Sequence, residues 1–225
     1  TVALRAAYGQ FKPQKELGLV TGSATVAPGS VVSTLEITID RPRLWSPDDP
    51  FLYTLEVTSD WAEAPTPKEG RDRFAFRTGF RDFRIVDGYF YLNGKRFYPK
   101  SLHGNFFDPI WMYGTPRDMT YLSQDFPLLK QAGFNMYRFL LSGVLPEQLD
   151  QADEMGFLIY SEHETSWLQK PETKHGVTLA DLVRRDRNHP SLVIWGLLNE
   201  TEPGRFYDEA KGWLPRLRTI DDTRL

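Results

Sequence analysis

The chain has 225 residues, of which 40% are hydrophobic and 14% aromatic, enough for a substantial core in one or two globular domains. The formal net charge is -3, and basic and acidic residues are interspersed, so the charge pattern of proteins that bind nucleic acid or membrane surfaces is absent. There is no cysteine, which excludes disulfides, thiol catalysis and thiolate metal sites; no apolar stretch is long enough to cross a bilayer, and the compartment stays open.

Residues 1–82 have the pattern of short β-strands separated by proline, glycine and aspartate. These strands alternate polar and apolar side chains or are rich in β-branched and aromatic residues, so we expect an antiparallel β-sandwich. Segment 63–71 is predicted to be an exposed hairpin tip, and Asn93-Gly94 predicts the turn of a further hairpin at 89–98. The predicted strands of the sandwich are 1–8, 31–39, 53–58 and 73–78.

From about Lys95 onward the pattern changes to alternating strands and helices. The helices begin and end at the usual signals: one starts at Pro146 and stops at Gly156, and another ends before Pro190. The last predicted helix contains Pro215 and is expected to be kinked or broken there. The predicted strands are 97–103, 134–140, 157–162 and 192–198, and the predicted helices are 124–132, 146–155, 178–189 and 206–219.

Consecutive βα units of this kind require parallel strands with helices outside them. Both an open doubly wound sheet and a (β/α)8 barrel satisfy this requirement. The open sheet usually carries a glycine-rich phosphate loop after its first strand, and none of the predicted strands is followed by one. We therefore favour a (β/α)8 TIM barrel, truncated after about four βα units at 83–225, preceded by a β-sandwich at 1–82.

Residues 186–200 are the most informative segment, because a helix end, an apolar strand and a carboxylic acid follow one another there. The active sites of (β/α)8 barrels lie at the carboxyl ends of the strands, and Asn199-Glu200 is at the end of this one. Glu200 is expected to be partly desolvated by the apolar run, which favours the protonated form that a general acid needs. Asn199 offers a donor and an acceptor for a substrate hydroxyl.

The other three predicted strands also bring polar residues toward this end: His103 after the first, Arg138 within the second and Glu162 after the third. Arg138 would keep a neighbouring carboxylate ionised or form a structural pair with Glu162, while His103 would bind substrate or satisfy loop carbonyls. Trp167 is a candidate aromatic platform for a sugar ring. A metal site at 162–164 is disfavoured because adjacent residues of an extended segment point apart, so we expect no metal and no cofactor.

Six segments of the chain carry a resemblance to a known family. They are LWSPDDPFLYTL at 44–55, RTGFR at 77–81, LNGK at 92–95, AGFNMYR at 132–138, ADEMGFLIYSE at 152–162 and DRNHPSLVIWGLLNE at 186–200. In this order they resemble glycoside hydrolase family 2, the group of β-galactosidases, β-glucuronidases and β-mannosidases. The resemblance spans nearly the whole chain and places the first segment in the sandwich.

The resemblance implies a retaining, exo-acting hydrolase of terminal β-glycosidic bonds, with an immunoglobulin-like sandwich before the catalytic barrel. It implies that Glu200 is the acid/base, that Asn199 contacts the sugar 2-hydroxyl, and that Arg138 supports the nucleophile. The family's nucleophile lies on the seventh barrel strand, whereas this chain is expected to stop before its fifth strand is complete, with 221–225 leading into that strand. The implied partner is a carbohydrate substrate.

Three departures from the family's pattern leave the sugar and the linkage open. Segment 139–146 lacks the Ser-His-Tyr-Pro that often follows the second-strand arginine, and Ser161-Glu162 stands where an Asp-Glu pair is usual. Segment 100–105 lacks the common Asn-Arg-His-Glu form, which puts the metal and substrate contacts of the galactosidase type in doubt.

Half a barrel would expose unpaired strand edges and apolar faces, so we expect the chain to aggregate or to pair with itself as a homo-oligomer. Without the nucleophile strand, we expect these residues alone to have little or no activity. Two alternatives stay open. One is a non-catalytic carbohydrate-binding or structural module on a degenerate glycosidase barrel, and the other is an inverting or endo-acting hydrolase of a related barrel family.

Overall fold

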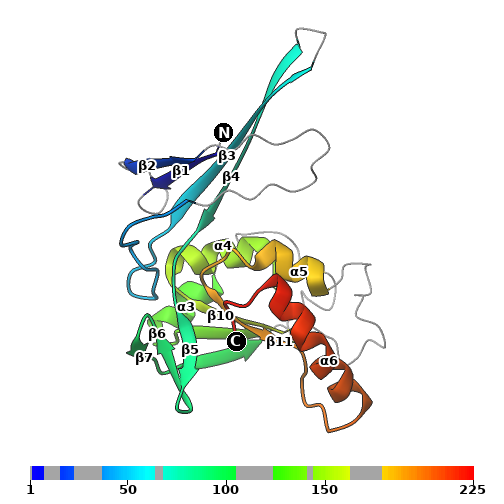
Figure 1. Cartoon of the computed structure of the whole chain (residues 1–225). Coiled ribbons are helices and arrows are strands. Elements are labelled where there is room, and N and C mark those ends of the chain that lie inside the picture. Colours follow the sequence, from blue (N-terminus) through cyan, green and yellow to red (C-terminus); the bar gives the residue numbers. More distant parts are fainter. Residues whose placement is uncertain are drawn as a thin grey trace. The chain divides into compact units, whose positions relative to one another are not determined.

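The computed structural model describes residues 2–7, 16–22, 37–63, 68–104, 124–140, 144–162 and 179–225. The chain divides into two compact units, the first made of residues 1–44 and 51–80 and the second of residues 45–50 and 81–225. The sheet of the first unit is antiparallel and the main sheet of the second is parallel (Figure 1), as the change of sequence pattern predicts.

The first unit contains a four-stranded antiparallel sheet in the order β2-β1-β3-β4. Its two long strands pair from Tyr53 opposite Thr78 to Glu63 opposite Lys68, so the predicted hairpin is confirmed with a tip narrower than 63–71. Residues 37–39 of the predicted strand 31–39 are not in a strand, and the rest of it lies outside the described residues. The strands are β1 (Val2–Ala7), β2 (Glu16–Gly22), which was not predicted, β3 (Tyr53–Glu63) and β4 (Lys68–Thr78).

The second unit begins with a small antiparallel sheet of three strands, β5 (Phe83–Val86), β6 (Tyr89–Leu92) and β7 (Lys95–Arg96). Asn93 and Gly94 have φ of 52° and 77°, the positive values that a two-residue type I′ turn requires, so the predicted hairpin is confirmed. A second turn of the same kind joins β5 to β6 at Asp87-Gly88, with φ of 50° and 80°. The sequence pattern Asp-Gly signals this turn as well.

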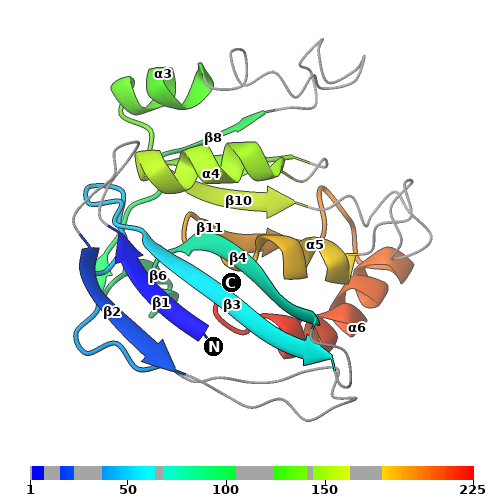
Figure 2. The ribbon, with the colours of Figure 1, turned by 90° about the horizontal axis from the view of Figure 1, so that it is seen from above.

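The main sheet of the second unit has four parallel strands in the order β11-β10-β9-β8. Its helices follow one another along the sheet in chain order (Figure 2). The last helix runs through Pro215 without a break, and none of the helices in the described part of the chain is long and apolar enough to span a membrane. The strands are β8 (Ser101–Gly104), β9 (Met136–Phe139), β10 (Leu158–Glu162) and β11 (Leu192–Gly196), and the helices are α3 (Asp125–Gln131), α4 (Pro146–Met155), α5 (Leu179–Asp186) and α6 (Arg205–Ile220).

One apolar core joins all four of these helices to β9, β10 and β11. Its fully buried members include Leu149 of α4, Ile159 of β10 and Val183 of α5. Beyond β11 the backbone N–H of Trp195 donates to Leu225 O, and the N–H of Leu225 donates to Val193 O, both at 3.0 Å. Leu225 therefore lies beside β11 in the position of a next parallel strand, as expected for 221–225.

By its contacts, the segment 45–50 groups with the second unit, apart from the residues on either side of it in the sequence. Trp45 is fully buried, and its indole Nε1 donates to Asp153 O at 2.8 Å. Lys130 Nζ donates to the carbonyls of Met155 and of Pro47. The contacts with Asp153 and Met155 satisfy carbonyls of the last turn of α4, which have no partner within the helix. The local pattern of strands and turns around Trp45 does not predict that this residue caps a helix far along the chain.

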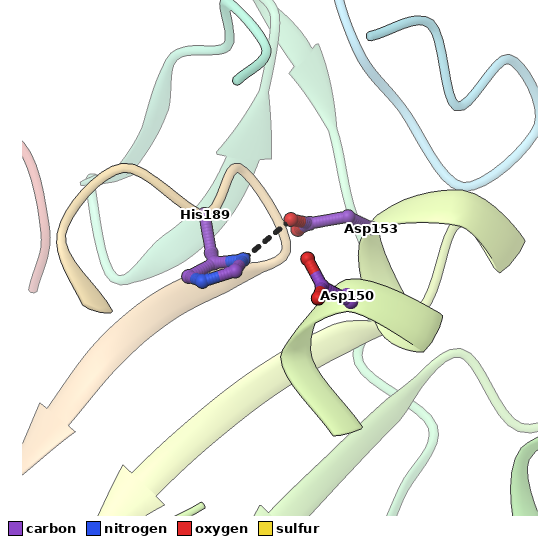
Figure 3. A group of neighbouring side chains, drawn as sticks. All are labelled: Asp150, Asp153 and His189. Atoms are coloured by element: carbon purple, nitrogen blue, oxygen red, sulfur yellow. Dashed lines mark hydrogen bonds and ion pairs between the residues drawn. The ribbon is translucent and has the colours of Figure 1, made fainter. Parts of the chain in front are cut away.

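A polar cluster of Asp150, Asp153 and His189 connects α4 to the residues before β11 (Figure 3). Its potential metal-ligand atoms lie within 4.8 Å of one another. Both oxygens of Asp153 are already engaged, since Oδ1 accepts from Ser191 N–H at 2.9 Å and Oδ2 lies 2.6 Å from His189 Nδ1. The cluster sits at the amino ends of the strands, opposite to the edge where such barrels carry their chemistry. We interpret it as a structural clamp between α4 and β11.

The clamp predicts a pH-dependent part of the stability. Burial lowers the pKa of His189, but the hydrogen bond to Asp153 and the charges of Asp153, Asp186 and Asp150 outweigh this effect and raise the pKa above that of an ordinary histidine. The resulting stabilisation is complete below the unfolded-state pKa and is lost as pH rises through the folded-state value. His189→Gln should remove this loss from urea unfolding curves measured between about pH 5 and pH 9.

The matched variant is His103→Gln, which changes an exposed histidine of the same unit and should keep the pH dependence of the unchanged chain. The same decline of the unfolding free energy with pH in His189→Gln would contradict the clamp.

Candidate active site

Three of the candidate residues, Arg138, Glu162 and Asn199, are hydrogen-bonded to one another near the carboxyl ends of the parallel strands. Arg138 lies on β9, directly opposite His103 on β8 and Tyr160 on β10. Because facing residues of neighbouring parallel strands share one side of the sheet, these three form a row across it. Glu162 is the last residue of β10 and lies opposite Gly196, the last residue of β11.

The buried carboxylate of Glu162 is the centre of the site. It has no solvent exposure, and its Oε2 accepts from Arg138 Nε at 2.9 Å and from Arg138 Nη2. The same Nη2 also donates to Asn199 Oδ1 at 2.9 Å. The structural pairing of Arg138 with Glu162, which the sequence left as one of two readings, is thus present, and the pair reaches Asn199 as well.

The contact with Arg138 determines which end of the Asn199 amide is presented. Guanidinium groups only donate, so the atom that they contact must be the amide oxygen. The amide nitrogen Nδ2 is then the end left for a ligand. This sharpens the expectation for Asn199, because it would act as a donor toward an acceptor atom of the substrate.

Glu200 differs from its expectation in burial. It is exposed rather than partly desolvated, because β11 ends at Gly196 and the chain leaves the sheet before Asn199. Its φ is 46°, in the left-handed region that costs a residue with a side chain about 1–3 kcal/mol and that clusters at functional sites. The hydroxyl of Thr201 donates to Asn199 O at 2.9 Å and stabilises this turn.

The remaining predicted residues are placed only in part. His103 is exposed and shares the row of Arg138. Trp167 lies outside the described residues, as do His163 and Glu164. Sequence reasoning missed Tyr160 and Gly196, both of which contact the site. A glycine inside an otherwise apolar strand is the signal that could have found the latter.

The pair of Arg138 and Glu162 predicts a large loss of stability when one partner is removed. Glu162→Ala leaves a partly buried guanidinium without its carboxylate, and we expect the free energy of unfolding to fall by about 3–5 kcal/mol. Urea denaturation gives this value directly.

Glu209→Ala is the matched control, because it removes the carboxylate of the exposed pair between Arg205 and Glu209, which is 2.8 Å apart. That change should cost less than about 1 kcal/mol. Equal losses of unfolding free energy in the two variants would show that the buried pair of Arg138 and Glu162 stabilises the fold no more than an exposed pair does.

The chain matches two family models along almost its whole length. The model described as "Glycosyl hydrolases family 2, TIM barrel domain" matches residues 83–225, and "Glycosyl hydrolases family 2" matches residues 5–81. The chain is 31% identical over 182 residues to the β-galactosidase BoGH2A of Bacteroides ovatus, a match covering 76% of this chain and 20% of that relative.

Solved structures of similar fold include two β-glucuronidases. The enzyme of Dictyoglomus thermophilum has a TM-score of 0.70 and 23% identity, covering 99% of this chain and 38% of that one. The enzyme of Bacteroides uniformis has a TM-score of 0.76 and 22% identity, covering 100% of this chain and 28% of that one. The chain therefore spans much less than half the length of these relatives. With an immunoglobulin-like domain followed by a TIM-barrel domain, it belongs to glycoside hydrolase family 2, a family of carbohydrate-cleaving hydrolases.

Proposed function

We propose that these residues supply the acid/base half of a retaining, exo-acting β-glycosidase, and that the activity belongs to a longer protein that contains them. The observation that carries this proposal is the hydrogen-bonded set of Arg138, Glu162 and Asn199 beside an accessible Glu200. The set lies at the strand ends, where barrels of this kind carry their chemistry. In this proposal residues 1–82 form the sandwich and residues 83–225 the first half of the barrel.

Each residue has one role in the proposed reaction. Glu200 protonates the glycosidic oxygen as the leaving group departs, and later removes a proton from the water that releases the sugar. Exposure of Glu200 suits this role, because the acid must reach an oxygen of an incoming substrate. Asn199 donates from Nδ2 to the oxygen of the sugar 2-hydroxyl, a contact that strengthens in the transition state. Arg138 holds the Asn199 amide in that orientation.

A retaining mechanism also needs a nucleophilic carboxylate about 5–5.5 Å from the acid/base. We propose that it comes from a later barrel strand, as the family resemblance implies, and that Arg138 faces it across the barrel. The named relatives act as β-galactosidase and β-glucuronidase, so aryl β-galactosides and aryl β-glucuronides are the first substrates to test.

The acid/base role of Glu200 predicts a dependence on the leaving group. In the full-length protein, Glu200→Ala should lower kcat/KM on aryl β-glycosides with poor leaving groups by about 10²–10⁴-fold. Substrates with good leaving groups, such as dinitrophenyl glycosides, need little protonation. The variant should therefore carry out the glycosylation step faster on these substrates than on those with poor leaving groups.

The matched variant Glu202→Ala changes an exposed carboxylate two positions away and should leave both substrates unaffected. If Glu200→Ala hydrolysed substrates with poor leaving groups as fast as the unsubstituted protein does, the acid role would be excluded.

The proposed origin of the nucleophile on a later strand predicts that the 225 residues by themselves form no glycosyl-enzyme intermediate. A mechanism-based label that traps such an intermediate should modify the full-length protein and leave the isolated chain unmodified in intact-mass spectra. Labelling of the isolated chain at a carboxylate within residues 1–225 would place the nucleophile here instead.

A further inference from the structure

Tyr160 is held in place by the absence of a side chain at Gly196. An ideal Cβ at Gly196 would lie 2.4 Å from Tyr160 Cε2, 2.9 Å from Glu162 Cγ and 3.0 Å from Glu162 Cα. Contacts this short are not tolerated, so any larger residue must displace the Tyr160 ring, the Glu162 side chain or the strand itself. The glycine thus lets the ring of one strand lie against the backbone of the next.

The ring of Tyr160 also lies against Arg138. The guanidinium carbon is 5.1 Å from the ring centroid, within the range of a cation–π interaction, and the two residues face each other in the strand register. Tyr160 therefore lies beside both members of the ion pair: its ring faces the guanidinium of Arg138, and its ring and the Glu162 side chain both lie against Gly196.

Only one of the two oxygens of the Glu162 carboxylate accepts hydrogen bonds from Arg138. Oε2 receives both bonds from Arg138, whereas Oε1 is buried and has no hydrogen-bond partner of good geometry in the described part of the chain. A buried acceptor without a donor is costly. Burial of the Tyr160 phenol, together with the charge and hydrogen bonding of Glu162, raises the pKa of Tyr160, so its hydroxyl stays protonated and able to donate.

We propose that Tyr160, seated over Gly196, is a positioning residue for Asn199: it fixes the Glu162 carboxylate from the side that Arg138 leaves open. Glu162 and the Tyr160 ring then hold the guanidinium, and the guanidinium holds Asn199 Oδ1. Tyr160 itself would touch no substrate. Its effect on the reaction would appear at the sugar 2-hydroxyl, because that is the atom toward which the Asn199 amide is oriented. This inference rests on the proposed function.

The test compares two substrates of the full-length protein, an aryl β-glycoside and its 2-deoxy analogue. Tyr160→Phe keeps the ring and removes the donor, and Gly196→Ala displaces the ring or the Glu162 side chain beside it. Each should lower the preference for the 2-hydroxyl substrate, measured as the ratio of the two kcat/KM values, by about tenfold, the effect of one hydrogen bond to a charged group. Adding Tyr160→Phe to Asn199→Ala should change that ratio no further.

Gly212→Ala is the matched glycine control, because no atom lies within 4 Å of a Cβ at Gly212 and that residue is on α6. It should leave the ratio unchanged. An unchanged ratio in Tyr160→Phe, or an equal loss on both substrates, would overturn the positioning role. Absence of any glycosidase activity in the full-length protein would instead overturn the proposed function.

A second measurement needs no activity. In the free energy of unfolding, Tyr160→Phe and Glu162→Gln should be coupled, so that the double variant's unfolding constant differs at least about threefold from the product of the single effects. Additive effects would show that the phenol does not serve the carboxylate and would overturn the proposal on structural grounds alone.

Discussion

A carboxylate with no exposure to solvent lies at the end of β10, and the candidate site is arranged around its need for a cation. An unpaired buried charge would be strongly destabilising, so Glu162 requires the guanidinium of Arg138 on the neighbouring strand. In the parallel register of β9 and β10, Arg138 lies opposite Tyr160, and Glu162, two residues after Tyr160, lies on the same side of the sheet within reach of Arg138. Once Arg138 is held there, its remaining donor capacity reaches Asn199. An electrostatic requirement of folding therefore also orients an amide at the rim.

The two ends of β11 carry different kinds of chemistry. At its carboxyl end the backbone turns through the strained φ of Glu200 and exposes a carboxylate. At its amino end charged side chains bind backbone carbonyls, with Arg81 Nη2 and Arg224 Nε donating to Leu192 O at 2.7 and 2.8 Å. Burial and the charge of Arg224 lower the pKa of Arg81 to about 9. Rigid anchoring at one end supports a strained, accessible turn at the other, as in a barrel whose lower face provides stability.

Local signals predicted elements well, whereas contacts between distant segments were not predictable. Helix α4 has the expected bounds because Pro146 begins it and Gly156, with φ of 69°, ends it. Strand β11 was predicted two residues too long, since Leu197 and Leu198 continue the apolar run after the chain has left the sheet. The set of polar strand ends followed from barrel geometry, but Tyr160 read as one more residue of a buried strand. Its proposed role depends on Gly196 of the neighbouring strand. The sequence of one strand does not reveal which residues of another strand lie beside it.

Trp45 has a consequence for the order of folding. Its indole bonds to a carbonyl 108 residues further along the chain, at the end of α4. Contacts of such sequence separation form late, because a long loop must close first. During synthesis from the amino terminus, the segment 45–50 emerges well before α4 and cannot reach its final place until that helix is made. The segment 45–50 is therefore made before the elements of the second unit that it packs against. Until α4 has formed, the large apolar side chain of Trp45 cannot be buried in its final site.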